Sequence, residues 1–397
     1  MKNLFFLLVM TIASAGLYAQ TADSASVHPL VDALKGIEYP RSNAEGGAKF
    51  LAYLESLYSN RAEWEKRKAE IKSCLPLALK LSPLPPRPQT PVVSTPKRKY
   101  DGYTVENFAI ETLPGIYVAG SIYKPLEIKG QCPVMLNPNG HFTDGRYRPD
   151  QQYRCAVQAR MGAIAVSWDL FAWGESCLQF DGSLHRFSGV QTIQVLNAIR
   201  ILDHLLSMKE ADPARIGITG GSGGGSQTMM LSAIDDRIAL SVPTVMLSSY
   251  FAGGCPCESG MPVHFCGGRT NNAEIAAMFA PKPQLVLSDG KDWTSDVPRL
   301  EYPFMQRIYS FYHAENNLEN DHFPDEGHDY GISKRKSLYR FLSLHFGLDI
   351  HQADESKVSI ENESQMYVFG GEGEKLPANA IHGKEALVKI LQAYNIY

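Results

Sequence analysis

The sequence lacks a long apolar run, an excess of either charge and any internal repeat. Its longest apolar stretch, at positions 4–12, is shorter than the roughly 20 residues that a transmembrane helix needs. The 38 Lys and Arg residues are offset by 42 Asp and Glu residues, so the basic surplus of nucleic-acid-binding domains is missing. Neither a membrane span nor a nucleic-acid partner is therefore expected. With 397 residues, 44% of them hydrophobic, the chain has the composition of an ordinary globular protein.

The N-terminus carries the pattern of an export signal. Lys2 precedes the apolar run at 4–12, and small residues at 13–15 provide the pattern that signal peptidase recognises. These features predict a signal peptide at 1–19 and a mature protein that is secreted or periplasmic. Disulfides persist in such an oxidising compartment.

Composition divides the rest of the chain into three parts. Residues 20–100 combine a helical pattern with a proline-rich connector, which predicts an N-terminal helical arm. Residues 101–350 hold the apolar strand patterns and form the expected main domain. Residues 351–397 follow as an accessory segment, with a short strand predicted at 365–369 and a helix at 384–393.

Short apolar runs alternate with helical patterns across the main domain. The first two runs flank a Pro-Gly turn and predict a β-hairpin. The predicted strands are 104–112, 116–123, 134–136, 163–166, 216–218, 239–242, 284–287 and 319–323. Between them, 195–206 has the apolar stripe of a helix that packs on a sheet. The pattern predicts an α/β fold, a three-layer sandwich whose sheet is mostly parallel, with an N-terminal helical extension.

The most informative motif is Gly220-x-Ser222-x-Gly224, directly after a predicted strand and before a predicted helix. A sharp strand-to-helix turn leaves no room for side chains two positions before and after the serine, and it exposes the hydroxyl as a nucleophile. A phosphate-binding P-loop would need a Lys after its last Gly, but Ser226 follows Gly225. The context therefore favours a nucleophilic Ser222.

A serine nucleophile needs a histidine base and an acid that orients it, and in this type of fold they follow in the order serine, acid, histidine. His328 lies in a turn between a predicted strand and a predicted helix, and it is the histidine best placed for this role. Asp292 follows the 284–287 strand and is the preferred acid, while Asp289 is the alternative.

Attack by such a serine places negative charge on the carbonyl oxygen of the substrate, and backbone N–H donors are needed to stabilise it. The amide of Gly223, at the start of a helix, is the first predicted donor. The loop after the 134–136 strand supplies the second, through Gly140 or His141. The side chain of His141 either touches substrate or braces the loop.

Three further segments carry a family resemblance. They are Asp-Pro-Ala-Arg-Ile-Gly at 212–217, Trp-Asp-Leu-Phe-Ala-Trp-Gly-Glu-Ser at 168–176, and Asp-Trp-Thr at 292–294. Together with the serine motif, they resemble the α/β-hydrolase esterases related to acetyl xylan esterases, over about 103–348. The resemblance implies a secreted carbohydrate esterase that acts on acetyl or pectic methyl esters of plant polysaccharide or oligosaccharide. It also implies Ser222, Asp292 and His328 as the catalytic triad.

Two other functions fit the pattern less well. A peptidase of the same fold would need a domain that selects peptides, and nothing in the sequence encodes one. A non-catalytic carbohydrate-binding module with a decayed site is disfavoured because the serine, aspartate and histidine are all present.

The sequence contains an odd number of cysteines, seven, so at least one is unpaired within the chain. Cys255, Cys257 and Cys266 with His264 form a Cys3His set, but its spacing departs from that of structural zinc sites. A disulfide from Cys255 or Cys257 to Cys266 is the favoured prediction. No metal and no organic cofactor is expected.

Substrate contacts are predicted from arginines and tryptophans in loops. A pectic substrate carries carboxylates, which an arginine can pair with, and the candidates are Arg146, Arg148, Arg186 and Arg269. Taken singly, each is ordinarily a solvated surface charge, and two that converge near Ser222 would favour an acidic sugar over neutral xylan. Trp173 and Trp293 are candidates for stacking on sugar rings, although core packing is the ordinary role of such residues.

Overall fold

The computed structural model describes residues 42–397. The predicted signal peptide at 1–19 and the first part of the predicted arm lie outside this range. Within it, no helix combines the length and the hydropathy needed to cross a bilayer.

The N-terminal arm consists of two helices, α2 (Ala44–Glu55) and α3 (Arg61–Ala78). Each begins at an asparagine whose side chain accepts a hydrogen bond from a backbone N–H of the first turn, Asn43 for α2 and Asn60 for α3. Trp64 of α3 is fully buried. A buried ion pair between Arg67 of α3 and Glu274 joins the arm to the main domain.

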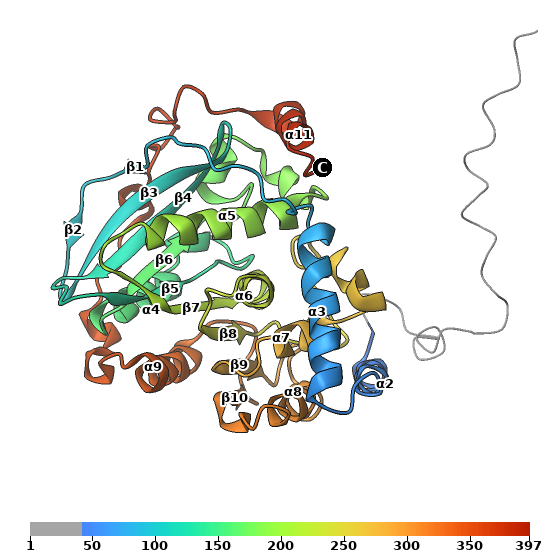
Figure 1. Cartoon of the computed structure of the whole chain (residues 1–397). Coiled ribbons are helices and arrows are strands. Elements are labelled where there is room, and N and C mark those ends of the chain that lie inside the picture. The colour runs from blue at the N-terminus through green and yellow to red at the C-terminus, as the bar shows by residue number, and fades with distance from the viewer. Residues whose placement is uncertain (1–41) are drawn as a thin grey trace, which may run out of the picture.

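A ten-stranded sheet forms the centre of the molecule (Figure 1). Its strands are β1 (Val93–Ser94), β2 (Arg98–Lys99), β3 (Tyr103–Leu113), β4 (Ile116–Pro125), β5 (Cys132–Leu136), β6 (Ile164–Trp168), β7 (Ala211–Gly221), β8 (Leu240–Thr244), β9 (Gln284–Asp289) and β10 (Leu318–Phe323). Their order is β1-β3-β4-β6-β5-β7-β8-β9-β10, with β2 paired to β3. The hairpin β3–β4 is antiparallel and β4 also pairs antiparallel with β6, while all pairs from β6 to β10 are parallel. The predicted hairpin and mostly parallel sheet are confirmed.

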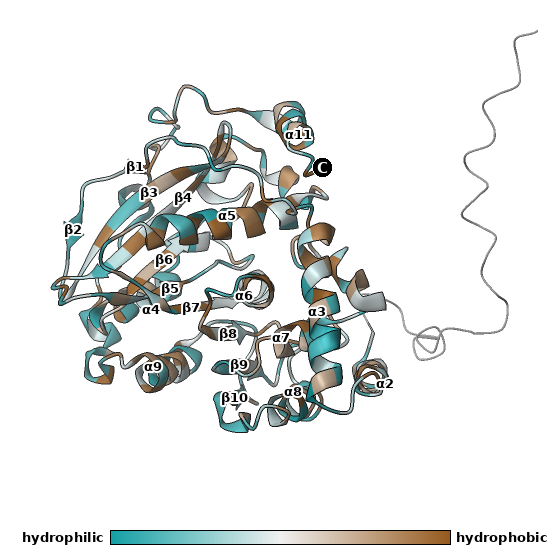
Figure 2. Ribbon diagram, viewed as in Figure 1, coloured by the Kyte–Doolittle hydropathy of each residue, from teal (hydrophilic) through white to brown (hydrophobic). Residues whose placement is uncertain are grey.

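Helices cover both faces of the sheet (Figure 1). One face carries α5 (Val190–Leu206), α6 (Gly223–Ile234), α7 (Asn272–Ala277) and α8 (Glu301–Ser310), and the other carries α4 (Pro149–Arg160) and α9 (Ile332–Phe346). Side chains along β5 alternate between the two layers, so that Val134 and Leu136 join one core and Met135 joins the other. Figure 2 shows hydrophobic and hydrophilic residues interleaved along α3, as expected for a helix with one buried face. The three-layer α/β sandwich is confirmed.

Short helices occupy many of the connections. They are η1 (Gly145–Tyr147), η2 (Gly174–Leu178), η3 (Gly182–Arg186), η4 (Val263–Gly268), η5 (Glu315–Asn317), η6 (Ile350–Gln352) and η7 (Glu355–Lys357). Two α-helices, α10 (Glu363–Met366) and α11 (Gly383–Ala393), belong to the C-terminal segment, and α11 is where a helix was predicted.

The predicted strand at 365–369 is wrong. Asn362 and Gln365 form a reciprocal capping box that starts the one-turn helix α10 instead. The backbone N–H groups of Val368 and Phe369 then donate to the carboxylate of Glu175, at 2.7–3.0 Å, rather than to a neighbouring strand. A side chain of the main domain thus replaces the sheet partner that a strand would need.

The predicted disulfide is also wrong. Cys266 is bonded to Cys74 of α3, with 5.5 Å between the two Cα atoms, and both Cys255 and Cys257 are free thiols. The reason is the packing of α3 against η4, which brings Cys74 to Cys266 across 192 positions of the sequence. Sequence spacing alone favoured the nearer partners.

Candidate active site

Ser222 lies at the turn between β7 and α6. Its backbone has φ 55° and ψ -123°, a conformation that non-glycine residues rarely adopt and that is typical of functional turns. Flanking glycines make the turn possible: a Cβ atom at Gly220 would lie 2.6 Å from the carbonyl of Gly224, and one at Gly224 would lie 2.4 Å from the carbonyl oxygen of Pro138. The crowding expected two residues before and two residues after the serine is therefore present.

His328 and Asp292 are joined by a hydrogen bond. Nδ1 of His328 lies 2.9 Å from Oδ2 of Asp292, whose side chain is only 2% exposed. The other carboxylate oxygen of Asp292 accepts hydrogen bonds from the backbone N–H and the hydroxyl of Thr294. A carboxylate held in this way fixes the imidazole with its proton on Nδ1 and leaves the lone pair of Nε2 available.

The sheet brings these residues to one edge. Ser222 follows β7, Asp292 follows β9 and His328 follows β10, and the carboxyl ends of these parallel strands lie at the same edge of the sheet. The ring of Phe142 lies between the histidine and the serine turn. Its centroid is 5.7 Å from that of His328, and its edge lies 3.6 Å from the position of a Cβ atom built on Gly221.

The loop after β5 packs directly against the serine. A Cβ atom at Gly140 would lie 2.4 Å from the carbonyl oxygen of Gly221 and 3.1 Å from Cβ of Ser222, so only glycine fits there. The imidazole of His141 packs against the start of α6. A Cβ atom built on Gly223 would lie 2.8 Å from Cε1 of His141. The backbone of both predicted donor segments therefore borders Ser222.

A cavity of about 310 Å³ opens beside Ser222. Trp173 and Arg186 contribute to its walls, together with His141 and Glu258. Trp173 therefore forms part of the cavity wall beside Ser222. Trp293 instead packs its ring 4.2 Å from His328 and 4.4 Å from Phe251.

Of the four candidate arginines, Arg186 alone lines this cavity. The prediction that Arg146 contacts substrate is wrong, because its side chain is fully buried and pairs with Asp169 and Glu175. Arg269 lies outside the cavity lining as well. Its guanidinium covers the ring of Phe265 at 4.2 Å, in the region that η4 shares with α3. Arg148 similarly covers the ring of Phe142 at 4.0 Å.

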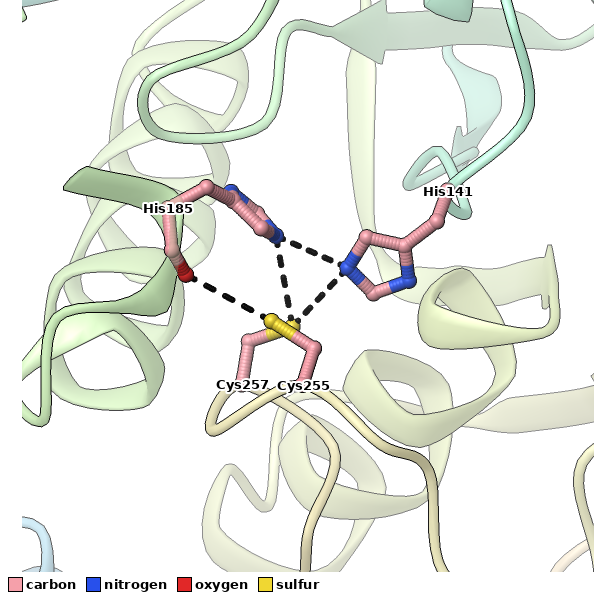
Figure 3. Close-up of side chains that lie close together, drawn as sticks. All are labelled: His141, His185, Cys255 and Cys257. Carbon is pink, nitrogen blue, oxygen red and sulfur yellow. Dashed lines mark hydrogen bonds between the residues drawn. The ribbon is translucent and has the colours of Figure 1, made fainter. Parts of the chain in front are cut away.

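Next to the cavity, two histidines and two cysteines converge on one point (Figure 3). Nε2 of His141 lies 2.8 Å from Nε2 of His185, and Sγ of Cys257 lies 3.1 Å and 3.6 Å from these two nitrogens. One ligand atom from each of His141, His185, Cys255 and Cys257 lies within 4.8 Å of every other. This set differs from the Cys3His set that the sequence suggests, since His264 is directed to Asn272 and Cys266 is in a disulfide.

Three of these four side chains have pKa values shifted from their ordinary range. A hydrogen bond from Cys257 holds the pKa of the Cys255 thiol far below its ordinary value, and both histidines add to this effect. Burial opposes charge on His141, but its bonds to Cys255 and Glu258 outweigh this effect and raise its pKa to about 9. Burial raises the pKa of Cys257. These shifts favour a Cys255 thiolate beside a His141 imidazolium.

Comparison with solved structures places this geometry in a family. The structure superposes on Methylesterase BT1017 with a TM-score of 0.86 and 50% sequence identity, over 90% of this chain and 80% of that one. The chain is a carbohydrate esterase of the α/β-hydrolase type. It is accordingly a carboxylic ester hydrolase.

More distant structures share the fold of this esterase. A protein from Bacteroides fragilis described as an acetyl xylan esterase has a TM-score of 0.55 at 16% identity, over 71% of this chain and 82% of that one. A CE15 glucuronoyl esterase from Teredinibacter turnerae has a TM-score of 0.53 at 13% identity, over 72% and 86% of the two chains. No family model and no curated protein sequence matches the chain.

Proposed function

We propose that the chain is a secreted serine methylesterase that removes methyl groups from esterified uronates of pectic polysaccharide or oligosaccharide. The observation that carries the proposal is the hydrogen-bonded pair His328 and Asp292 at the sheet edge where Ser222 sits in a strained turn. The methyl ester is favoured over the acetyl ester because Methylesterase BT1017 is 50% identical. The N-terminal export pattern favours secretion.

The proposed reaction has two steps. The Ser222 oxygen attacks the ester carbonyl carbon while its proton passes to Nε2 of His328, and the imidazolium is stabilised by Asp292. The N–H groups of Gly223 and of the Gly140-His141 segment stabilise the oxyanion.

Collapse of the tetrahedral intermediate breaks the bond to the methoxy oxygen. His328 returns its proton to that oxygen, and methanol leaves. Water then attacks the uronyl ester on Ser222 by the same route, with His328 as the base. The products are a free uronate carboxylate and the regenerated serine.

Arg186 suggests how the substrate is held. It is exposed, and it lines the cavity that also contains Ser222. Partly esterified pectin carries free carboxylates beside its methyl esters, and a guanidinium binds a carboxylate through paired hydrogen bonds. Trp173 offers an apolar wall for the sugar ring in the same cavity.

The test is Ser222→Ala, assayed on methyl-esterified pectin, acetylated xylan and nitrophenyl acetate. Ser226→Ala, four residues further along α6, is the matched control. We expect kcat to fall by at least about 10³-fold in Ser222→Ala and to stay within about twofold in the control.

The products identify the ester. Methanol released from pectin by the native protein supports the proposal. Acetate release from xylan with no methanol release from pectin would contradict the methyl ester specificity, and full activity of Ser222→Ala would contradict the serine mechanism.

A further inference from the structure

We propose that His141, His185, Cys255 and Cys257 form a zinc site beside the esterase centre. Two imidazole nitrogens and two thiols are a ligand set that zinc favours, and their four ligand atoms lie within 4.8 Å of one another. Ligands at roughly 2.0 Å (nitrogen) and 2.3 Å (sulfur) around a tetrahedral zinc are separated by about 3.3–3.8 Å. The three separations among His141, His185 and Cys257 are 2.8, 3.1 and 3.6 Å, each within about half an ångström of that range.

Both histidines are oriented as metal ligands are. Nδ1 of His185 lies 2.5 Å from the carbonyl oxygen of Phe171, so this nitrogen carries the proton and Nε2 carries the lone pair. Nδ1 of His141 lies 3.4 Å from Oε1 of Glu258. A carbonyl or a carboxylate on the second ring nitrogen is the usual support of a zinc-bound histidine.

This orientation creates a conflict that a cation resolves. With both Nδ1 atoms protonated, the two Nε2 atoms face each other at 2.8 Å, so neutral rings would oppose two lone pairs and only the imidazolium form of His141 would place a proton between them. A single shared proton would relieve that pair, but it would leave two further sulfur atoms directed at the same point (Figure 3). One divalent cation satisfies all four groups together, and it binds both cysteines as thiolates.

The four ligands come from three separate segments. His141 belongs to the loop after β5, His185 to η3, and Cys255 and Cys257 to the loop after β8. A zinc ion would join these segments around the cavity that contains Ser222. Because the protein supplies four ligands, the site has the closed coordination of a structural zinc rather than the open position of a catalytic one.

The ligand His141 connects the site to the chemistry. Its neighbour Gly140 packs against Ser222, and its ring packs against Gly223. The metal would therefore hold the loop whose backbone borders the serine. His141, His185, Cys255 and Cys257 would thus act on the reaction indirectly, by positioning this loop.

The first experiment measures zinc in the full chain purified without a chelator. We expect about one zinc per chain in the native protein and in the control Cys177→Ser, which changes an exposed free cysteine. We expect less than about a tenth of that content in Cys257→Ser and in His185→Ala. Full zinc content in both ligand variants would overturn the proposal.

The second experiment uses the native chain alone, so it does not depend on how the variants fold. Zinc is removed with a chelator under reducing conditions, and cobalt chloride is added. We expect the intense absorption of tetrahedral cobalt with thiolate ligands, together with protection of Cys255 and Cys257 from alkylation. Native protein that binds neither zinc nor cobalt, or that carries a Cys255–Cys257 disulfide by mass spectrometry, would overturn the proposal. Ester hydrolysis is not the readout, so failure here is distinct from failure of the proposed function.

Discussion

Nδ1 of His328 lies 2.9 Å from Oδ2 of Asp292, and the aspartate side chain is almost completely removed from solvent. The contact connects the loops after β9 and β10, two neighbouring parallel strands. It gives the imidazole one fixed tautomer. The mechanism depends on that tautomer, because Nε2 has to accept the proton of the serine hydroxyl.

We predict that Asp292→Asn lowers kcat by about 10⁴-fold while the fold is retained. The asparagine amide would donate to Nδ1, which would place the imidazole proton on Nε2. Asp325→Asn, an exposed residue of the His328 loop, is the control and should leave kcat within about twofold. Steady-state kinetics on nitrophenyl acetate measures both. A fall of less than tenfold in Asp292→Asn would exclude this orienting role.

We predict that Arg186→Gln raises KM for methyl-esterified pectin by about tenfold, with little change in kcat, because one charge-assisted contact to substrate is lost. Hydrolysis of nitrophenyl acetate, which has no carboxylate, should stay unchanged. Arg61→Gln, on the N-terminal arm, is the control. If KM for pectin does not change in Arg186→Gln, the uronate contact is made elsewhere.

We predict that Arg146→Met destabilises the fold by about 3–5 kcal/mol. The substitution leaves the carboxylates of Asp169 and Glu175 buried without their cation, at 1% and 3% side-chain exposure. Arg299→Met breaks an exposed pair with Asp296 and should cost less than about 1 kcal/mol. Urea denaturation compares the two variants, and equal losses would contradict the prediction.

We predict that His264 makes the protein less stable in acid. Burial lowers its pKa to about 4 in the folded chain, against 6.5 for the ordinary value. Between these values the unfolded chain binds a proton that the folded chain does not, so stability falls as pH falls from about 6.5 to about 4. The expected loss between pH 7 and pH 5 is about 2 kcal/mol.

His264→Gln tests this assignment. It retains a side chain that can donate to Asn272, the hydrogen-bond partner of His264 at 2.9 Å, and it has no titrating group. Urea denaturation at pH 5 and pH 7 should show a smaller difference in the variant than in the native protein. An unchanged difference would assign the acid sensitivity to other groups.

Local sequence patterns predicted the sheet and the serine turn well. Apolar runs located the strands because a parallel sheet buries both of its faces, and the glycine spacing located the turn because backbone crowding there is local. The start of β7 was missed by five residues. Ala211 joins the sheet by pairing with Cys132. The residues next to Ala211 in the sequence are mostly polar, so they do not have the pattern of a buried strand.

The features that were missed depend on contacts between distant segments. Nothing near His185 distinguishes it from a surface histidine, since its partners His141 and Cys257 are 44 and 72 positions away. Arg146 was predicted in a loop at the substrate edge, but Asp169 and Glu175 hold it in the interior. Tertiary packing determines whether such a side chain lies in the interior or at the surface, and residue type alone does not predict it.

The disulfide between Cys74 and Cys266 has a consequence for proteolysis. It joins α3 to the end of the long loop after β8, across 192 positions of the sequence. A protease that cleaves one exposed loop between these cysteines would leave the two fragments covalently attached. The arm and the loop beside the cavity would stay on one molecule, and the nick would separate the fragments only after reduction.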